Sequence, residues 1–331
     1  MTLSAYFSSL SILNLFSRMP AAVAQGIIWG LMALGVFITF RLLDVADLTV
    51  DGSFATGGAV TVMLLLAGWP AWAALLAAVV AGVLTGLCTG LLHTKLGIPV
   101  ILAGILTQFS LYSINLRIMT KANQTASVKK FGMFWEAEHH GGFLLSSLYI
   151  PQAIAAGLVL AAIVVAVLYW YFGTEQGSAL RATGSNPAMS RAQGINIDRM
   201  KVIGLGISNG LVALAGGLMT QYQGTADVSM GRGAIVIGLA AIIIGEVLCE
   251  AFFRKGCNFA VRLVFVVLGG VIYYAVMVVI LWLRLDPNDL KLFTAVIVAA
   301  FLAVPYLQGR AKSSFARSKK LGAREGGGTK C

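Results

Sequence analysis

The stretch AAGLVLAAIVVAVLYWYF, Ala155–Phe172, runs for eighteen residues without a single charge. An apolar run of about 18 or more residues is long enough to cross the hydrocarbon core of a bilayer as an α-helix. Because lipid offers no partners to backbone N–H and C=O groups, such a run must satisfy them internally, as a helix does. A strand of a membrane β-barrel would alternate polar and apolar residues, and this stretch does not. It therefore predicts a membrane-spanning helix.

Similar apolar blocks occur on both sides of this stretch, along most of the chain. Hydrophobic residues make up 58% of the 331 residues and charged residues only 11%, whereas soluble domains carry about 25% charged residues. We therefore predict an all-α fold, a polytopic membrane helical bundle of about nine transmembrane helices (eight to ten fit the pattern) with a discontinuous early helix. The expected blocks are 21–40, 54–68, 71–92, 98–118, 148–172, 201–221, 233–253, 259–283 and 289–308.

The blocks divide the chain into three regions. Residues 1–20 are expected to form an N-terminal interfacial segment, residues 21–308 a transmembrane domain, and residues 309–331 a basic tail. Within the domain, the polar connection 173–200 is rich in Arg, as the tail is rich in Lys and Arg. Cytoplasmic loops carry an excess of these residues, so we expect the connection and the C-terminus in the cytoplasm. The net charge of +11 thus reports membrane orientation and does not indicate nucleic-acid binding.

The composition gives no sign of catalytic or metal chemistry. The cysteines Cys88, Cys249, Cys257 and Cys331 form no close CxxC pair, so we infer neither a metal site nor a disulfide framework. No nucleophile–base constellation indicates a membrane enzyme. A phosphate loop of the G-x-x-x-x-G-K-[ST] type is also missing from the sequence, so no ATP site is expected on this chain. We expect no catalytic residue, metal or bound cofactor.

The segment RLLDVADLTVDGSF, residues 41–54, joins the first two apolar blocks and contains three acidic residues. Asp44, Asp47 and Asp51 are spaced three and four residues apart, so a helix would place them on one face. Carboxylates near hydrocarbon usually face a cavity or a partner. The spacing is therefore compatible with acidic side chains that line a substrate pathway.

Gly52 is expected to break this helical pattern, and Asp51 or Ser53 could cap the helix that restarts there. A broken helix of this kind can direct backbone donors towards a substrate near the membrane centre. The alternative is a polar interfacial turn with a simple cap, in which Asp44 pairs with Arg41. Spacing alone does not decide between the two interpretations.

A second polar pattern lies in the block 98–118. Gln108, Tyr112 and Asn115 recur at i, i+4 and i+7, which makes one face of a membrane helix polar and suits the wall of a pore. The alternative is hydrogen bonding between helices, worth a fraction of a kcal/mol to about 2 kcal/mol for each bond. The predicted substrate pathway comprises Asp47, Asp51, Ser53, Gln108, Tyr112 and Asn115.

The connection 173–200 carries a short helix signal outside the apolar blocks. Asn186 and Pro187 fit a helix start with Pro at the first position, and Gly194 fits its end. The pattern predicts a helix of about two turns from Pro187 to Gln193. Such a helix could lie in a groove on another protein or on the membrane surface.

The run ALRATG (Ala179–Gly184), followed by AMSRAQGINI (Ala188–Ile197), resembles the coupling loop of ABC importer permeases of the branched-chain amino acid and ribose transport type. The segment DLTVDGS (Asp47–Ser53) resembles this family's Asp-Leu-Ser/Thr-x-Gly segment, with Asp51 inserted. Residues 231–246 resemble its Gly-rich late helix, whose common Gly-Gly ending is here Gly-Glu. The resemblance covers roughly residues 20–305 and indicates a divergent branch, which includes aromatic amino acid systems.

The resemblance implies a permease subunit, not an enzyme, of an ATP-driven importer in the bacterial cytoplasmic (inner) membrane. It would translocate a small solute, preferably an amino acid, delivered by an extracytoplasmic binding protein. A separate cytoplasmic ABC ATPase would use ATP-Mg, and two copies of the permease would form the pore as a homodimer. The alternatives are an ion-gradient-driven secondary transporter and an ABC permease for a sugar or nucleoside. The implied ATPase-coupling residues are Arg181, Asn186, Pro187, Ala188, Met189, Arg191 and Gly194.

Overall fold

The computed structural model describes residues 12–126, 133, 143–253 and 257–282, and isolated positions between 292 and 303. Within these residues, eight helices are long and apolar enough to cross a membrane, which confirms the predicted all-α polytopic bundle. All eight belong to the first of two compact units, Met1–Arg284. The ninth predicted block and the basic tail lie almost entirely outside the described residues.

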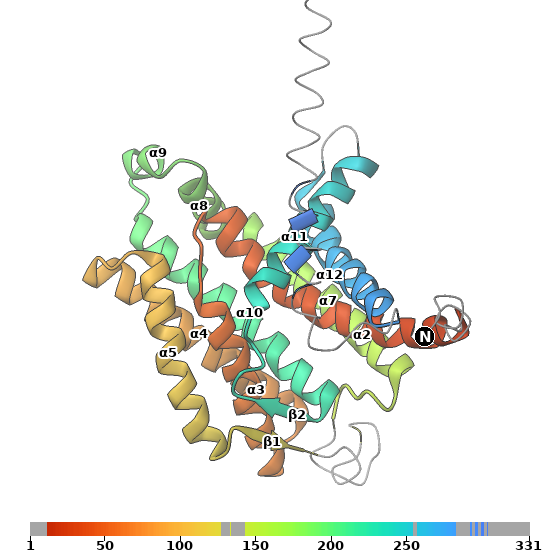
Figure 1. Cartoon of the computed structure of the whole chain (residues 1–331). Helices are drawn as coiled ribbons and strands as arrows, with labels where there is room; N and C mark the ends of the chain where they lie inside the picture. Colours follow the sequence, from red (N-terminus) through yellow and green to blue (C-terminus); the bar gives the residue numbers. More distant parts are fainter. Residues whose placement is uncertain are drawn as a thin grey trace, which may run out of the picture. The chain divides into compact units, whose positions relative to one another are not determined.

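Most of the helices follow one another directly along the chain, and a longer connection separates α5 from α7. Two short helices at one end of the bundle separate α7 from α10, and two paired strands lie at the opposite end (Figure 1). The spanning helices are α2 (Ile12–Phe37, continued by the π-helix η1, Ile38–Leu42), α3 (Thr49–Leu66), α4 (Ala71–Leu96), α5 (Val100–Met119), α7 (Ile150–Gly173), α10 (Ile197–Gln223), α11 (Ala234–Phe252) and α12 (Phe259–Trp282). The short elements are α8 (Glu175–Ser185), α9 (Pro187–Ala192), β1 (Asn123–Thr125) and β2 (Thr225–Asp227), the strands pairing antiparallel.

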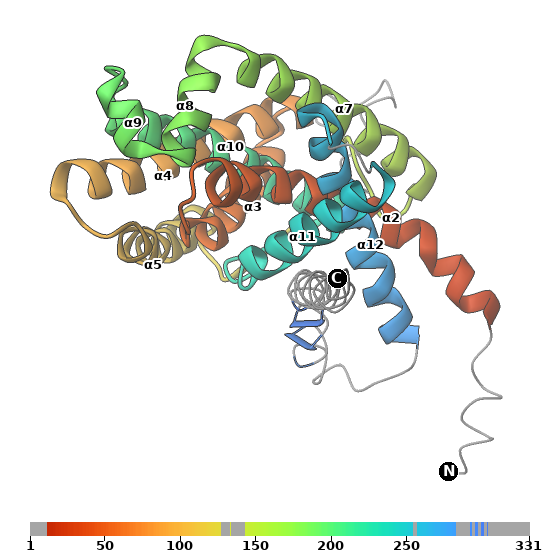
Figure 2. The ribbon, with the colours of Figure 1, turned by 90° about the horizontal axis from the view of Figure 1, so that it is seen from above.

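Helix α10 forms the centre of the bundle, where it contacts α2, α3 and α4. Of its most apolar 18-residue window, 78% is buried. A Cβ atom at Gly57 of α3 would collide with the carbonyl of Ala213, and one at Gly216 of α10 would collide with the carbonyl of Phe54. Small residues let membrane helices approach closely. Seen from above, α4 and α10 lie on one side of α3, and α11 and α12 lie on the other (Figure 2).

The predicted break in the early helix is present, but it occurs before Gly52. The helical geometry ends after Leu42, residues 43–48 are irregular, and Gly52 lies inside α3. Asp44 has a positive φ of 54°, a conformation that Asp adopts more readily than most residues. The three aspartates therefore do not share one helical face, and that expectation is wrong because the irregular segment separates them.

Two side-chain pairings also differ from expectation. Cys249 and Cys257 form a disulfide with their Cα atoms 6.3 Å apart, although no disulfide framework was inferred from the sequence. The sequence did not indicate this pair, because the two cysteines are eight residues apart and form no CxxC motif. Arg41 pairs with Glu246 through Nε and Oε1 at 2.9 Å, and not with Asp44; α2, which η1 continues, packs against α11.

Candidate functional site

A pocket of about 440 Å³ lies between α3, α5 and the segment that leads into α11. Small-molecule sites occupy about 300–1,000 Å³, so this pocket is large enough for a small solute. It combines acidic, basic, amide and aromatic side chains, and we call it the polar pocket. Its lining residues are Asp51, Gly52, Ala55, Gln108, Phe109, Tyr112, Asn115, Val228 and Arg232.

Asp51 lies in the first turn of α3 and holds the beginning of α11. Its Oδ2 accepts a hydrogen bond from the backbone N–H of Gly233 at 3.0 Å, and its Oδ1 accepts one from Ile235 at 3.1 Å. The first N–H groups of a helix have no partner within the helix, and a carboxylate there is favoured by the helix dipole. Asp51 therefore caps α11, although it belongs to α3. The sequence had suggested that Asp51 could cap α3 itself.

The polar face of α5 contributes Gln108, Tyr112 and Asn115 to the same pocket. Asn115 is only 1% exposed, yet among the described residues neither its Oδ1 nor its Nδ2 has a hydrogen-bond partner. An unpaired buried polar group costs about 1–3 kcal/mol, and such a group in a native protein calls for an explanation. The alternative interpretation, hydrogen bonds from this face to neighbouring helices, receives no support at Asn115.

Asp47 and Ser53 do not line the polar pocket, because their side chains are bonded inside the bundle. The Oδ1 of Asp47 accepts from the backbone N–H of Thr49 at 2.9 Å, and its Oδ2 accepts from the Asn209 amide at 2.7 Å. The Ser53 hydroxyl donates to Oδ1 of Asn209 at 2.6 Å and also contacts the Thr85 hydroxyl. Burial raises the pKa of the Asp47 carboxyl, and the bonds from Thr49 and Asn209 oppose that rise. This network joins the start of α3 to α4 and α10.

We expect Asp47→Ala to lower the free energy of unfolding by about 1–3 kcal/mol, because it removes one of the two acceptors of the buried Asn209 amide and leaves it the Leu205 carbonyl. Asp44→Asn is the matched control, since Asp44 is exposed and Asn tolerates its positive φ; we expect a change within about 0.5 kcal/mol. Reversible unfolding in mixed micelles measures both variants. Equal losses for the two variants would contradict the role assigned to the network.

Arg232 is the one charged residue of the pocket that the sequence analysis missed. It lies in the turn between β2 and α11, beside the carboxylate cap. In the described part of the chain the ion pair formed is Arg41–Glu246, so Arg232 has no carboxylate partner there. The signal in the sequence was a Gly-Arg-Gly motif directly before the block 233–253, where an isolated arginine precedes a spanning helix.

The predicted extramembrane helix is present as α9. The Asn186 side chain caps it by accepting from the backbone N–H of Met189 at 3.0 Å, and Gly194 follows it with φ 82°. Every residue of α9 except Ser190 is exposed, and the apolar Met189 is 59% exposed. Ala188 and Arg191 are exposed on the same short helix. The helix therefore presents a largely free surface beyond the spanning helices.

Arg181 lies apart from that exposed surface. Its guanidinium sits 5.4 Å from the ring centre of Phe259, at the start of α12, within the range of a cation–π contact. One turn further along α8, a Cβ atom at Gly184 would collide with the carbonyl of Leu42 in η1. The α8–α9 hairpin is thus anchored on η1 and on α12, and α9 extends from this base.

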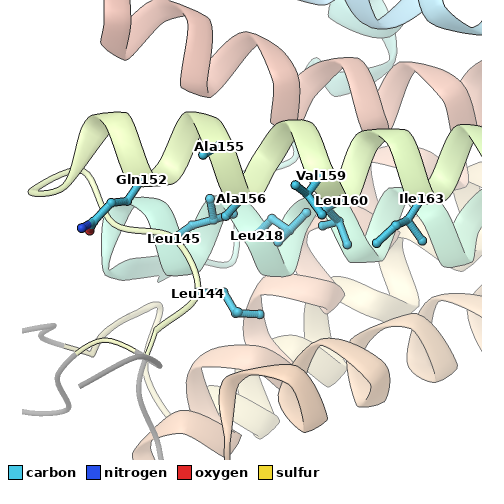
Figure 3. A pocket seen from close by; sticks show the side chains of 9 residues that line it. All are labelled: Leu144, Leu145, Gln152, Ala155, Ala156, Val159, Leu160, Ile163 and Leu218. Atoms are coloured by element: carbon cyan, nitrogen blue, oxygen red, sulfur yellow. The ribbon is translucent and has the colours of Figure 1, made fainter. Parts of the chain in front are cut away.

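A hollow of about 500 Å³ on α7 has a different character. Figure 3 shows its side chains, which come mainly from α7 and face Leu218 of α10 and the loop residues Leu144 and Leu145. Gln152 is the polar residue in this lining, and Val159 and Ile163 are more than half exposed. Such a surface suits hydrocarbon chains, so the hollow is not a candidate site for a polar solute.

A polytopic helical bundle with a polar pocket between its helices and an exposed helical hairpin at one end is compatible with a membrane transport permease. A family model described as the permease component of branched-chain amino acid transport systems matches residues 19–305. The chain belongs to this family of ABC-type permeases.

Several known proteins resemble the chain along much of its length. It is 37% identical over 301 residues to a tyrosine transport system permease protein of Clostridioides difficile, covering 91% of this chain and 96% of the relative. It is 32% identical over 279 residues to an uncharacterized protein of Rickettsia prowazekii, covering 84% of this chain and 94% of the relative. It is 26% identical over 245 residues to the ribose import permease protein of Escherichia coli K12, covering 74% of this chain and 72% of the relative. No solved structure gives a significant match.

Proposed function

We propose that the chain is the permease subunit of an ATP-driven importer for an amino acid, with aromatic amino acids such as tyrosine as the first candidates. The observation that carries this proposal is the match to a tyrosine transport permease over nearly the full length of both chains. The ribose permease is more distant and covers less of the chain, which places sugars second. An extracytoplasmic binding protein would deliver the substrate to the permease.

We further propose that a separate cytoplasmic ABC ATPase docks on α9. This ATPase would hydrolyse ATP-Mg in its own active site, and the permease would contribute no catalytic group. The exposed Met189 supports this proposal, because a large apolar side chain in water is typical of a surface that a partner covers. Lys95 and Arg199 line one hollow at the α9 end of the bundle. Basic residues favour the cytoplasmic side, so the α9 end and the C-terminus would face the cytoplasm of a bacterial inner membrane.

The structure contains a mechanical connection from α9 to the polar pocket that supports this function. Helix α8 packs through Gly184 on Leu42, the last residue of η1. The irregular residues 43–48 follow directly and lead into α3, whose Asp51 holds the first turn of α11. A movement of α9 that tilts α8 would therefore reach both helix starts that border the pocket. Two such permeases, related as a homodimer, would place their pockets on either side of a shared pathway.

Reconstitution tests the proposed function. The permease is purified with the proposed ABC ATPase and binding protein and inserted into liposomes that contain ATP. We expect uptake of labelled L-tyrosine that depends on ATP, on the binding protein and on the ATPase. Uptake by the permease alone under a proton or sodium gradient would identify a secondary transporter instead. ATP-dependent uptake of ribose without uptake of any amino acid would overturn the substrate assignment.

A further inference from the structure

The polar pocket contains one cationic and one anionic side chain that are not paired with each other. Arg232 and Asp51 both line it, yet within the described residues they form no ion pair. Arg232 is exposed on the turn before α11, so its guanidinium is accessible to a ligand in the pocket. A ligand that carries both a negative and a positive charge would satisfy both side chains at once.

Most of the hydrogen-bonding capacity in the pocket is unused. A guanidinium has five N–H donors, and no side-chain acceptor for Arg232 is present among the described residues. Asp51 uses its two oxygens on the N–H groups of Gly233 and Ile235, but a carboxylate offers about four lone-pair sites, so it retains capacity for an ammonium group. Both polar atoms of the buried Asn115 also have no hydrogen-bond partner in the part of the chain that the structure describes. The pocket thus offers donors and acceptors of both kinds.

The lining also includes two aromatic residues of α5, Phe109 and Tyr112. Phe109 is 71% exposed and Tyr112 is 45% exposed, so their rings are available to an incoming group. Aromatic rings stack offset or edge-to-face on one another. An aromatic side chain on the ligand would therefore find a matching surface next to the charged groups.

We infer that the polar pocket binds the zwitterionic head of an α-amino acid, with the carboxylate on Arg232, the ammonium on Asp51 and Asn115, and an aromatic side chain against Phe109 and Tyr112. This inference rests on the proposed function and names the site and the substrate class within it. A neutral sugar leaves both charged side chains without a partner, and a simple anion or cation satisfies only one of them. The site therefore selects for the charge pattern of an amino acid.

Direct binding tests the inference without the binding protein, which would otherwise select the ligand first. The permease–ATPase complex in lipid nanodiscs is exposed to L-tyrosine, and binding is followed by saturation-transfer NMR. We expect L-phenylalanine to compete with L-tyrosine for binding. Tyramine, which lacks the carboxylate, and ribose should not compete. Arg232→Gln should weaken binding at least about tenfold, as expected for the loss of a charge-assisted contact, and Arg232→Lys should retain part of it. Arg117→Gln, on α5 but outside the pocket, is the control and should bind as the unmodified protein does.

Equal competition by tyramine or ribose, or unchanged binding by Arg232→Gln, would overturn the inference. The same preparations are assayed for ATP-driven uptake with the binding protein present. Normal uptake of L-tyrosine by both the unmodified complex and Arg232→Gln would reject the site and leave the proposed function intact. Absence of amino acid uptake by the unmodified complex would reject the proposed function itself.

Discussion

Ala188→Glu is expected to reduce ATP-driven uptake by at least about tenfold, which corresponds to about 1.4 kcal/mol of lost coupling, while the protein still inserts and folds. Ala188 is exposed on α9, so the substitution leaves the bundle unchanged. A carboxylate in the centre of a docking surface would lose its water without gaining a partner, which is costly. Uptake and ATP hydrolysis are measured together in proteoliposomes, and we expect hydrolysis to lose its dependence on the binding protein.

Gln176→Glu is the matched control for this experiment. It introduces the same negative charge on α8, where Gln176 is exposed near the helix start and away from α9. A carboxylate near a helix start is favoured, so uptake should remain close to that of the unmodified protein. Unchanged coupling in Ala188→Glu, or an equal loss in both variants, would argue against α9 as the docking surface.

Asp51→Ala should cause the second large effect, a loss of uptake of at least about tenfold with the ATPase still bound. The variant removes both acceptors from the start of α11, and hydrogen bonds to a charged group are worth about 1.5–3 kcal/mol each. The start of α11 would then lose its position beside the pocket. Asp51→Asn keeps one acceptor oxygen, so its uptake should lie between that of the unmodified protein and that of Asp51→Ala. Uptake assays combined with co-purification of the ATPase measure both properties.

Asp227→Asn serves as the control for Asp51→Ala. Asp227 accepts through Oδ1 from the backbone N–H of Ser229 at 2.7 Å, and asparagine keeps that acceptor. Asp227 does not line the polar pocket, so its replacement should leave uptake nearly unchanged. Normal uptake by Asp51→Ala would reduce Asp51 to a cap with no role in transport.

The helices were predictable because each depends on a local property. A long run without charge must be helical in lipid, so the eight spanning helices lie close to the predicted blocks. The α9 boundaries follow from Asn186, Pro187 and Gly194, whose effects on the backbone also act locally. The polar face of α5 was visible for the same reason, since i, i+4 and i+7 spacing fixes which side chains share a face.

Partners distant in the chain were not predictable in this way. Asp51 caps a helix that starts more than 180 positions later, and Arg41 pairs with Glu246 across a similar separation. Arg232 becomes part of a pocket only because β2 and the following turn bring it beside α3 and α5. Gly52 was predicted to break the helix, but it lies inside α3, where close packing against α5 favours a glycine.

Hydrophobicity and helical periodicity, which are properties of consecutive residues, determined that this protein is a membrane bundle with a short helix outside it. Which acidic residue reaches a pocket and which is buried in a network was decided only by tertiary structure. Asp47 and Asp51 are four residues apart and chemically identical, yet packing against α10 pairs one with Asn209 while the start of α11 engages the other. A hydrogen bond depends on the position in space of both groups, and the sequence around one of them does not contain that position.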